Sequence, residues 1–261
     1  MEPIGSGLAA LAVDGHRADV TLSRPEKRNA MTVPLMEDLA TALERADAHE
    51  DVRAVVLRGE GPVFCAGMDL EMMRARAGDD GPERGAFPDL LDTLASVSVP
   101  TVAAIKRAAP AGAFELTLPC DFRVLGADAT YGVIEVKLGT FPHGGATQRL
   151  PRLVGLAKAK ELVLTGEFID PAEADACGLV TEVVDDDEVD AAASELADSL
   201  AANAPLGMTR AKQALDEALE TPLAEGLERE RALGRELDST RDYREGFEAR
   251  IEGREPTFEG R

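Results

Sequence analysis

Two glutamates in apolar surroundings are the residues of this sequence best suited to acid–base chemistry. Glu115 lies in the stretch FELTL, and Glu135 follows 20 residues later in YGVIEVKLG. Burial or a nearby like charge raises the pKa of a carboxyl group above its usual ~4.3, so that the group can hold a proton near neutral pH. Each glutamate also has two plain alternatives: a solvent-facing position or an ion pair with an arginine. For an isolated Glu in so acidic a chain, the solvent-facing position is favoured.

Glycine-rich turns lie beside polar residues in three segments. These segments are VFCAGMDL at Val63–Leu70, APAGAFELTLPCD at Ala109–Asp121 and YGVIEVKLGTFPHGGATQRLPRLVG at Tyr131–Gly155. Clusters of glycine beside polar residues make these three segments the candidates for a functional site.

Strands and helices alternate in the part of the chain that must position these segments. The expected strands are Leu8–Val13, Asp19–Ser23, Val52–Leu57, Thr101–Ile105, Phe122–Leu125 and Val180–Val184. The first two form a hairpin around Asp14-Gly15. Thr32 can cap a helix that has Pro34 in its first turn, and further helices are expected at Gly112–Leu118 and Lys158–Leu164. The polar, Gly-rich stretch Arg74–Pro88 is expected to be a loop with room for a short helix.

From Glu188 onward only helical patterns remain. The expected helices are Glu188–Ala202, Thr209–Glu220, Leu223–Leu237 and Tyr243–Ile251. Pro205 and Pro222 separate the earlier ones. Because this tail cannot extend a sheet, it must pack on the core, on a neighbouring subunit, or on both.

Acidic residues outnumber basic ones by a wide margin. Asp and Glu total 49 against 28 Lys and Arg, 22 of which are Arg, and the formal net charge is −21. This charge argues against binding nucleic acid or an anionic membrane surface, because both require a basic face. Salt screens repulsion beyond about 10 Å at 0.1 M and about 3 Å at 1 M, so we expect a salt-rich cytoplasm. The alternative is an ordinary acidic bacterial protein.

The cysteines and the N-terminus give no sign of secretion. Cys65, Cys120 and Cys177 are odd in number and far apart, which favours reduced side chains over disulfides or a zinc site. The first residues lack a basic region, and no segment reaches the ~18 apolar residues of a membrane span. We therefore expect a cytoplasmic protein without a metal site and without membrane association.

Five stretches, in this order along the chain, resemble the enoyl-CoA hydratase/isomerase (crotonase) family. They are LSRPEKRNAM at Leu22–Met31, VRAVVLRGEGPVFCAGMDL at Val52–Leu70, LGTFPHGGATQRLPRLVGLAKAKELVLTGE at Leu138–Glu167, AEADACGLVTEVV at Ala172–Val184 and STRDYREGFEAR at Ser239–Arg250. The resemblance implies an α/β fold. A crotonase-like spiral of repeated β-β-α units would span residues 1–195, and a helical C-terminal oligomerisation region would span residues 196–261. It also implies a homotrimer or a dimer of trimers.

The resemblance further implies an enzyme that holds the enolate of an acyl-CoA thioester. Backbone N–H groups of Met68 and Gly112 would form the oxyanion hole, each worth on the order of 3–4 kcal/mol. Glu115 would hold and deprotonate water, and Glu135 would exchange the proton at the α-carbon. Coenzyme A enters as part of the substrate, and no other cofactor is implied. Without the family pattern, Met68 would be a core methionine and Gly112 an ordinary helix start.

Coenzyme A is anionic, so its binding requires local positive charge on this acidic protein. The resemblance assigns substrate and coenzyme A binding to Arg24, Lys27, Arg28, Ala66, Asp69 and Leu70. Asp69 is expected to brace the oxyanion loop through local hydrogen bonds. Arg250 and Arg254 are the nearest candidates for a basic residue supplied by a neighbouring subunit. For all these arginines, surface ion pairs are an equal alternative.

Departures from the family pattern favour a specialised acyl group. KRAAPAGAFE at Lys106–Glu115 stands where the family often has NGYALGGGCE, and GVIE replaces GQPE before Glu135. Phe114 adds bulk at a site that is usually small. His143 replaces a usual glycine and either faces the acyl pocket or points to solvent, the latter being favoured. Met72 and Met73 are candidates for the pocket wall.

The sequence therefore predicts a hydratase-like lyase that adds water to a 2-enoyl-CoA. The nearest alternative is a double-bond isomerase, or another acyl-CoA-processing enzyme of the family, that works through the same enolate. A non-catalytic, RNA-binding relative is disfavoured by the charge and by the presence of both glutamates. A serine peptidase is disfavoured because there is no GxSxG motif and only His16, His49 and His143 could act as the base.

Overall fold

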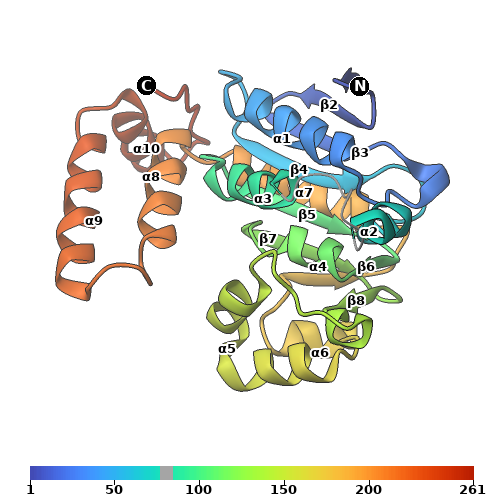
Figure 1. The fold of residues 1–261 in the computed structure, drawn as a ribbon. Coiled ribbons are helices and arrows are strands. Elements are labelled where there is room, and N and C mark those ends of the chain that lie inside the picture. The colour runs from blue at the N-terminus through green and yellow to red at the C-terminus, as the bar shows by residue number, and fades with distance from the viewer. Residues whose placement is uncertain (77–84) are drawn as a thin grey trace.

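The computed structural model describes residues 1–76 and 85–261 and shows a mixed α/β fold (Figure 1). A sheet has the strand order β1-β2-β3-β4-β5-β7-β9. The strands are β1 (Glu2–Ile4), β2 (Ala9–Asp14), β3 (Arg17–Leu22), β4 (Ala54–Gly59), β5 (Thr101–Ile105), β7 (Phe122–Gly126) and β9 (Glu182–Val184). The pairs β1-β2 and β2-β3 are antiparallel, whereas every later pair is parallel. Two short strands, β6 (Ala108–Pro110) and β8 (Thr130–Gly132), pair separately and in parallel.

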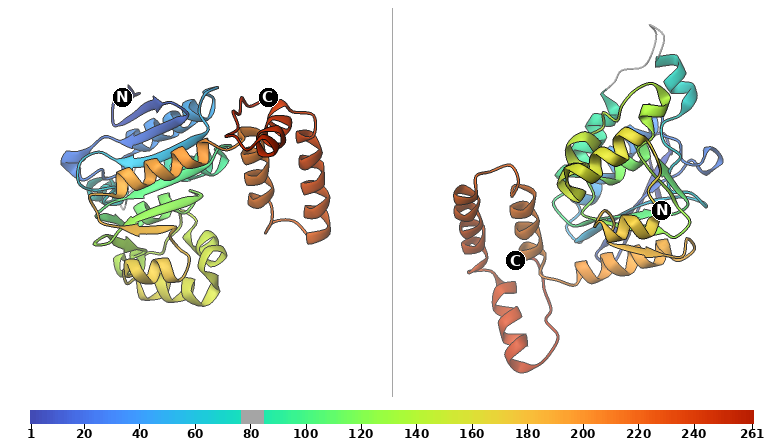
Figure 2. Two further views of the ribbon diagram at one scale, coloured as in Figure 1. Left: turned by 180° about the vertical axis from the view of Figure 1, so that it is seen from behind. Right: turned by 90° about the horizontal axis from the view of Figure 1, so that it is seen from below.

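Helices cover both faces of the sheet, and the strand residues alternate accordingly. On β4, Val55 and Leu57 join the core under α1 (Val33–Asp47) and α3 (Ala86–Ser96). Ala54 and Val56 face the other way and pack with α7 (Val189–Ala201). This period of two is the one that a strand buried on both faces requires. Figure 2 shows α7 lying across the face opposite to α1.

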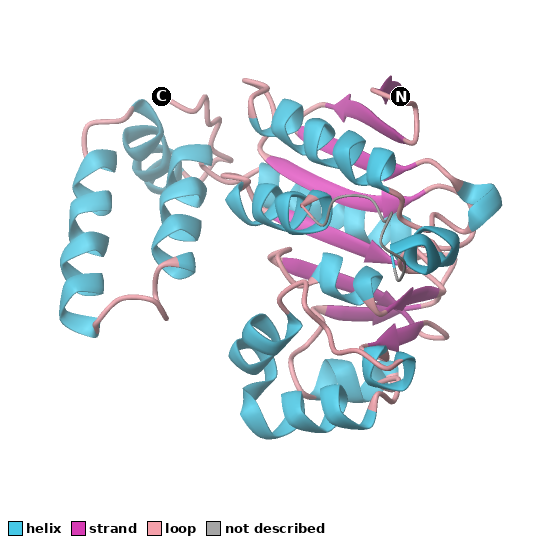
Figure 3. Cartoon of the chain, viewed as in Figure 1, coloured by secondary structure: helices cyan, strands magenta, loops and turns pink. Residues whose placement is uncertain are grey.

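The body has six further helical segments among its described residues. They are η1 (Pro25–Lys27), α2 (Leu70–Arg76), α4 (Gly112–Thr117), η2 (Glu135–Leu138), α5 (Ala146–Thr165) and α6 (Pro171–Ala176). Gly155 interrupts α5 with φ 77° and ψ 160°, so the expected helix Lys158–Leu164 is its second half. Figure 3 shows that the strands occupy the middle of the body and the helices its outside.

Three C-terminal helices stand beside the body rather than on the sheet. They are α8 (Pro205–Asp216), α9 (Leu223–Leu237) and α10 (Arg241–Glu252), and the views of Figure 2 show them on the far side of a connection from α7. The three helices and the connection between α8 and α9 expose many large apolar side chains: Leu215, Leu219, Leu223, Leu227, Tyr243, Phe247 and Ile251. The predicted domain boundary at residues 195 and 196 stays a prediction, and α7 spans it.

Most of the expected elements are confirmed, and the misses have local causes. Thr32 caps α1 by accepting a hydrogen bond from the Leu35 N–H, as expected. The helix expected to begin at Thr209 begins at Pro205, because proline suits the first helical position. The prediction of a loop at Arg74–Pro88 is wrong at both ends, because α2 extends to Arg76 and α3 begins at Ala86. The middle of that stretch lies outside the described residues. The sequence did not predict β1, β6 and β8, which have only three residues each. None of the described helices is both long and apolar enough to cross a membrane.

Candidate active site

Two segments that are distant in sequence run side by side at the edge of the body. The Phe64 N–H donates to the Lys106 carbonyl over 3.0 Å, and the Cys65 N–H donates to the Ala108 carbonyl over 3.2 Å. Further along, a Cβ added to Gly67 would lie 3.1 Å from the Pro110 carbonyl oxygen. The pairing therefore continues to the residues just before Met68 and Gly112.

Met68 and Gly112 meet where these segments end. A Cβ added to Gly112 would lie 3.1 Å from Met68 Cε, so the methionine side chain packs directly against the glycine. The Met31 N–H donates to Gly67 and the Asp69 N–H donates to Met31, which leaves the Met68 N–H on the opposite side. Among the described residues, neither the Met68 N–H nor the Gly112 N–H has an acceptor. Two free backbone donors therefore occur on touching residues.

Ala111 holds the turn before Gly112 in an unusual conformation. It is the residue that precedes α4, with φ 53° and ψ −125°, a region that favours glycine. Its N–H donates to the Gly132 carbonyl over 2.8 Å, and its carbonyl accepts from the Glu115 N–H over 3.1 Å. Phe114 is fully buried, with its ring 4.4 Å from that of Tyr131, and its expected bulk near the thioester stays a prediction.

Glu115 is a buried carboxyl group fixed by a backbone loop. Only 3% of the residue is exposed. Its Oε1 accepts hydrogen bonds from the Gly144 N–H at 2.8 Å and from the Ala146 N–H at 3.1 Å. A Cβ on Gly144 would lie 2.9 Å from Glu115 Oε2 and would overlap the ring of Phe87. The sequence did not single out Gly144, Ala146 or Phe87, although the glycine cluster in FPHGG was a signal.

Both glutamates have raised pKa values. Burial raises the pKa of Glu115 to about 7, against the lowering effect of its two hydrogen bonds, and the charge of Glu135 adds to the rise. Burial likewise raises the pKa of Glu135, which is 7% exposed. Its Oε2 is buried without a hydrogen-bond partner among the described residues. The site thus holds two interacting carboxyl groups, one with an oxygen unpartnered.

His143 is exposed, yet it lies next to the loop that holds Glu115. Its Nδ1 is 2.9 Å from the Phe141 carbonyl oxygen, and the ring centroids of His143 and Phe141 are 6.0 Å apart. A positive charge on its imidazole lowers the pKa of both Glu115 and Glu135. The side chain is therefore exposed, as the favoured alternative expects, and is also electrostatically coupled to both glutamates; a place at the acyl pocket stays a prediction.

Asp69 braces the Val63–Leu70 segment through local hydrogen bonds, as expected, and Arg24 is its partner. Arg24 Nη1 donates to Asp69 Oδ2 over 2.8 Å and to the Ala30 carbonyl over 2.9 Å. Asp69 Oδ1 accepts from the N–H groups of Glu71 and Met72 at the start of α2. The hydrogen bond from Arg24 is the main reason that the pKa of Asp69 is lowered. Arg24 thus forms the ion pair that was the alternative to coenzyme A binding.

The other residues assigned to coenzyme A surround the same loop. Lys27, Arg28 and Leu70 are exposed, and neither basic side chain forms an ion pair with a described residue. Ala66 is half-buried, and its N–H donates to the Arg28 carbonyl over 2.9 Å. The structure therefore brings the two basic residues close to the Val63–Leu70 segment.

Buried Asn29 links the Leu22–Met31 stretch to residues 60–64, although no sequence motif singled it out. Its Nδ2 donates to the carbonyls of Glu60, Val63 and Phe64, and its Oδ1 accepts from the Arg24 N–H.

In the C-terminal helices, Arg254 forms ion pairs with Glu245 and Glu252. Over residues 1–76 and 85–261, no three His, Cys, Asp or Glu side chains gather in a group that could hold a metal ion.

Known proteins are similar to this chain in sequence and fold. Residues 16–261 match the sequence profile of the enoyl-CoA hydratase/isomerase family. Mouse mitochondrial methylglutaconyl-CoA hydratase is 37% identical over 92% of this chain and 78% of its own. A probable enoyl-CoA hydratase of Rhizobium meliloti is 38% identical over 93% and 94%. The crystal structure of enoyl-CoA hydratase from Bacillus anthracis superposes with a TM-score of 0.91 at 32% identity, covering 97% of this chain and all of that one.

Proposed function

Because the chain belongs to the enoyl-CoA hydratase/isomerase family and has the crotonase fold, we propose that it adds water to the double bond of a 2-enoyl-CoA. Acyl-CoA processing of the hydratase type is the function that its relatives share. The observation that carries hydration itself is the pair of buried carboxyl groups, Glu115 and Glu135, both with raised pKa values.

The Met68 and Gly112 N–H groups would bind the thioester oxygen. Water attack at the β-carbon pushes electrons onto this oxygen, and donors fixed in advance stabilise the charge without reorganisation. Support comes from the contact between Met68 and Gly112 and from the absence of another acceptor for either N–H among the described residues. Loss of one such donor typically costs about 10²–10³ in kcat.

The two carboxyl groups would divide the proton transfers. Ionised Glu115 takes a proton from water as the oxygen bonds to the β-carbon, and protonated Glu135 gives a proton to the α-carbon. The sum adds one water to the double bond. A pKa of about 7 leaves Glu115 ionised in part of the molecules near neutral pH, and it makes the group a stronger base than an ordinary carboxylate. The unpartnered Oε2 of Glu135 supports a role as a donor to substrate.

Substitution of each glutamate by glutamine tests this division. E115Q and E135Q should each abolish most hydration, because an amide cannot exchange the required proton. The matched control is E44Q on the exposed face of α1, which should hydrate at the wild-type rate. An E115Q or E135Q variant that works near the wild-type rate would eliminate the two-carboxylate mechanism.

Double-bond isomerisation is the second candidate, since it uses the same enolate. It needs only one group that moves a proton between two carbons, whereas this site holds two carboxyl groups. Assays of both reactions on the same short, branched, long and aromatic acyl chains would separate the two activities and identify the acyl group. An isomerase should tolerate the loss of one glutamate better than a hydratase.

Coenzyme A binding is proposed for Lys27 and Arg28, which have no ion pair with a described residue. Arg24 would act indirectly, through Asp69. A double K27M/R28M variant should raise KM for acyl-CoA with little change in kcat. An unchanged KM would place the nucleotide elsewhere.

A homotrimer or a dimer of trimers is proposed for the assembly. Support comes from the many large apolar side chains exposed on α8, α9 and α10, because apolar surface in such quantity is typical of interfaces. Sedimentation equilibrium measures the mass directly, and a monomer at micromolar concentration would contradict the proposal. A salt-rich cytoplasm remains the proposed location, on the basis of the net charge of −21.

A further inference from the structure

We infer that Lys106 is a positioning residue for the oxyanion hole, fixing the turn that joins the Met68 segment to the Gly112 segment. This inference rests on the proposed function, because it assigns a task to the Met68 and Gly112 N–H groups. Lys106 directly follows β5 and precedes β6, so its backbone lies at the start of the path to Gly112. None of its atoms needs to touch the substrate.

The backbone of Lys106 joins the two donor segments. Its carbonyl oxygen accepts from the Phe64 N–H at 3.0 Å and from the Ala108 N–H at 2.7 Å. The first bond begins the pairing that runs through Cys65 and Ala108 to the contact of Gly67 with Pro110. A shift of Lys106 therefore moves the Met68 and Gly112 segments relative to each other.

The side chain of Lys106 ties this turn to α7. Its Nζ donates to Asp190 Oδ2 over 2.5 Å, and only 12% of the side chain is exposed. The neighbouring Arg107 N–H donates to Asp186 Oδ1 over 2.6 Å, just before α7. The turn is thus held at two successive residues by the segment that leads into α7.

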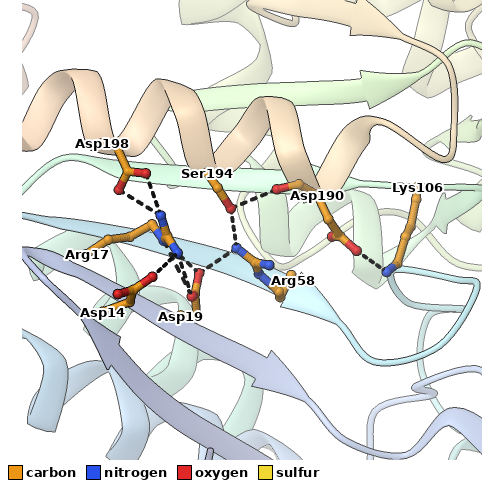
Figure 4. Close-up of polar contacts among 8 residues, drawn as sticks. All are labelled: Asp14, Arg17, Asp19, Arg58, Lys106, Asp190, Ser194 and Asp198. Carbon is orange, nitrogen blue, oxygen red and sulfur yellow. Dashed lines mark hydrogen bonds and ion pairs between the residues drawn. The ribbon is translucent and has the colours of Figure 1, made fainter.

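Asp190 belongs to a polar network along the interface between α7 and the sheet (Figure 4). Its carbonyl accepts from Ser194 Oγ, which in turn accepts from Arg58 Nη2 at 2.8 Å. Arg58 also binds Asp19, and at the far end Arg17 binds Asp198. Asp190 Oδ1 is buried without a partner, so Lys106 is the one cation that binds this carboxylate among the described residues.

Loss of the Lys106 cation should lower both stability and rate. The pair is largely buried, with 12% of the Lys106 and 37% of the Asp190 side chain exposed, so removal of the cation leaves a carboxylate without its counter-charge. A catalytic donor displaced by about 1 Å can in addition lower the rate about 10²-fold. Positioning is therefore distinguished from simple stabilisation by a change in kcat of the folded variant.

The test compares K106M with D198N, which breaks the ion pair at the other end of the same network. K106M should lower kcat about tenfold with KM within about twofold. D198N should leave both constants unchanged, because Asp198 lies at the end of the network away from Lys106. K106R retains the cation and should recover most of the lost kcat. D190N, which keeps the shape of the side chain, should lower kcat in the same way as K106M.

A binding measurement reports the oxyanion donors without the glutamates. A 3-oxoacyl-CoA forms an enolate that absorbs in the near ultraviolet, and the oxyanion donors should raise the fraction of enolate bound to the wild-type protein. K106M should lower that fraction at saturating ligand, whereas D198N should not. Equal enolate fractions and equal kcat values for K106M, D198N and wild type would overturn the inference.

Different results would refute the proposed hydration and the positioning role of Lys106. A wild-type protein that hydrates no enoyl-CoA would refute the proposed reaction, and the enolate fraction would still test Lys106. An active wild type with an equally active K106M would refute the role of Lys106 alone. If K106M does not fold, as judged by circular dichroism, then K106R and D190N carry the same comparison.

Discussion

Replacing Glu115 with glutamine should stabilise the protein at alkaline pH while it removes activity. In the folded state, burial raises the pKa of this carboxyl group from 4.5 to about 7. One pKa unit corresponds to about 1.36 kcal/mol, so ionised Glu115 destabilises the folded protein by about 3 kcal/mol relative to its protonated form. Glutamine carries no charge and avoids this cost.

The effect of E115Q on the free energy of unfolding depends on pH. Below pH 4.5, Glu115 is protonated in both the folded and the unfolded chain, and its ionisation costs nothing. Between pH 4.5 and about 7, the unfolded chain releases the proton first, so this group lowers stability as the pH rises. Above about pH 7, the full cost is present. The gain from E115Q should therefore be absent at pH 4 and reach about 1–3 kcal/mol at pH 8.5.

Glutamine can keep the hydrogen bonds that Glu115 forms. The amide oxygen of glutamine can accept from the Gly144 and Ala146 N–H groups, which lie 2.8 and 3.1 Å from Glu115 Oε1. Its NH₂ group then takes the place of Oε2 in the same buried surroundings. Desolvation of this NH₂ group is the reason that the expected gain starts below the full 3 kcal/mol estimated above.

Urea denaturation followed by circular dichroism measures the difference, since the chain has no tryptophan for fluorescence. Protein and salt concentrations must be held constant, because assembly and screening both change apparent stability. E44Q serves as the exposed control and should change stability little at either pH. An equal gain at both pH values, or none at pH 8.5, would show that Glu115 is not the buried group described above.

Three further predictions follow from single residues, and a fourth follows from the net charge. G144A should lower kcat about 10²-fold, because the new Cβ displaces Glu115 Oε2 and Phe87; a wild-type kcat would contradict the fixed carboxylate. A111G should raise the free energy of unfolding by about 1 kcal/mol by relieving the strain at φ 53°, and a loss in urea denaturation would refute that. H143Q should move the acidic limb of the kcat/KM profile to higher pH, since the imidazolium lowers the pKa of both glutamates; an unmoved limb would rule out the coupling. Activity and assembly should rise between about 0.1 M and 1 M KCl as salt screens the net charge of −21, and full assembly in dilute buffer would count against this.

The sequence by itself determined the class of fold and the identity of the two central glutamates. Strand and helix patterns are local, so periodicity located β5 and α9 at their observed bounds. Glu115 and Glu135 stood out because they match the two glutamates of the family pattern, whereas an isolated Glu in so acidic a chain would be expected to face solvent. Short strands such as β6 and β8 were missed, because three residues are too few to show a period.

Only the tertiary structure decided how the site is held. Gly144 and Phe87 lie 29 and 28 positions away from Glu115 along the chain, and burial brings them together around its carboxyl group. The sequence left open whether Arg24 forms an ion pair, and the fold brings it to Asp69, 45 residues away. The tie from Lys106 to Asp190 spans 84 residues. Side-chain type sets what a group can do, whereas its pKa and its partner depend on neighbours that only folding supplies.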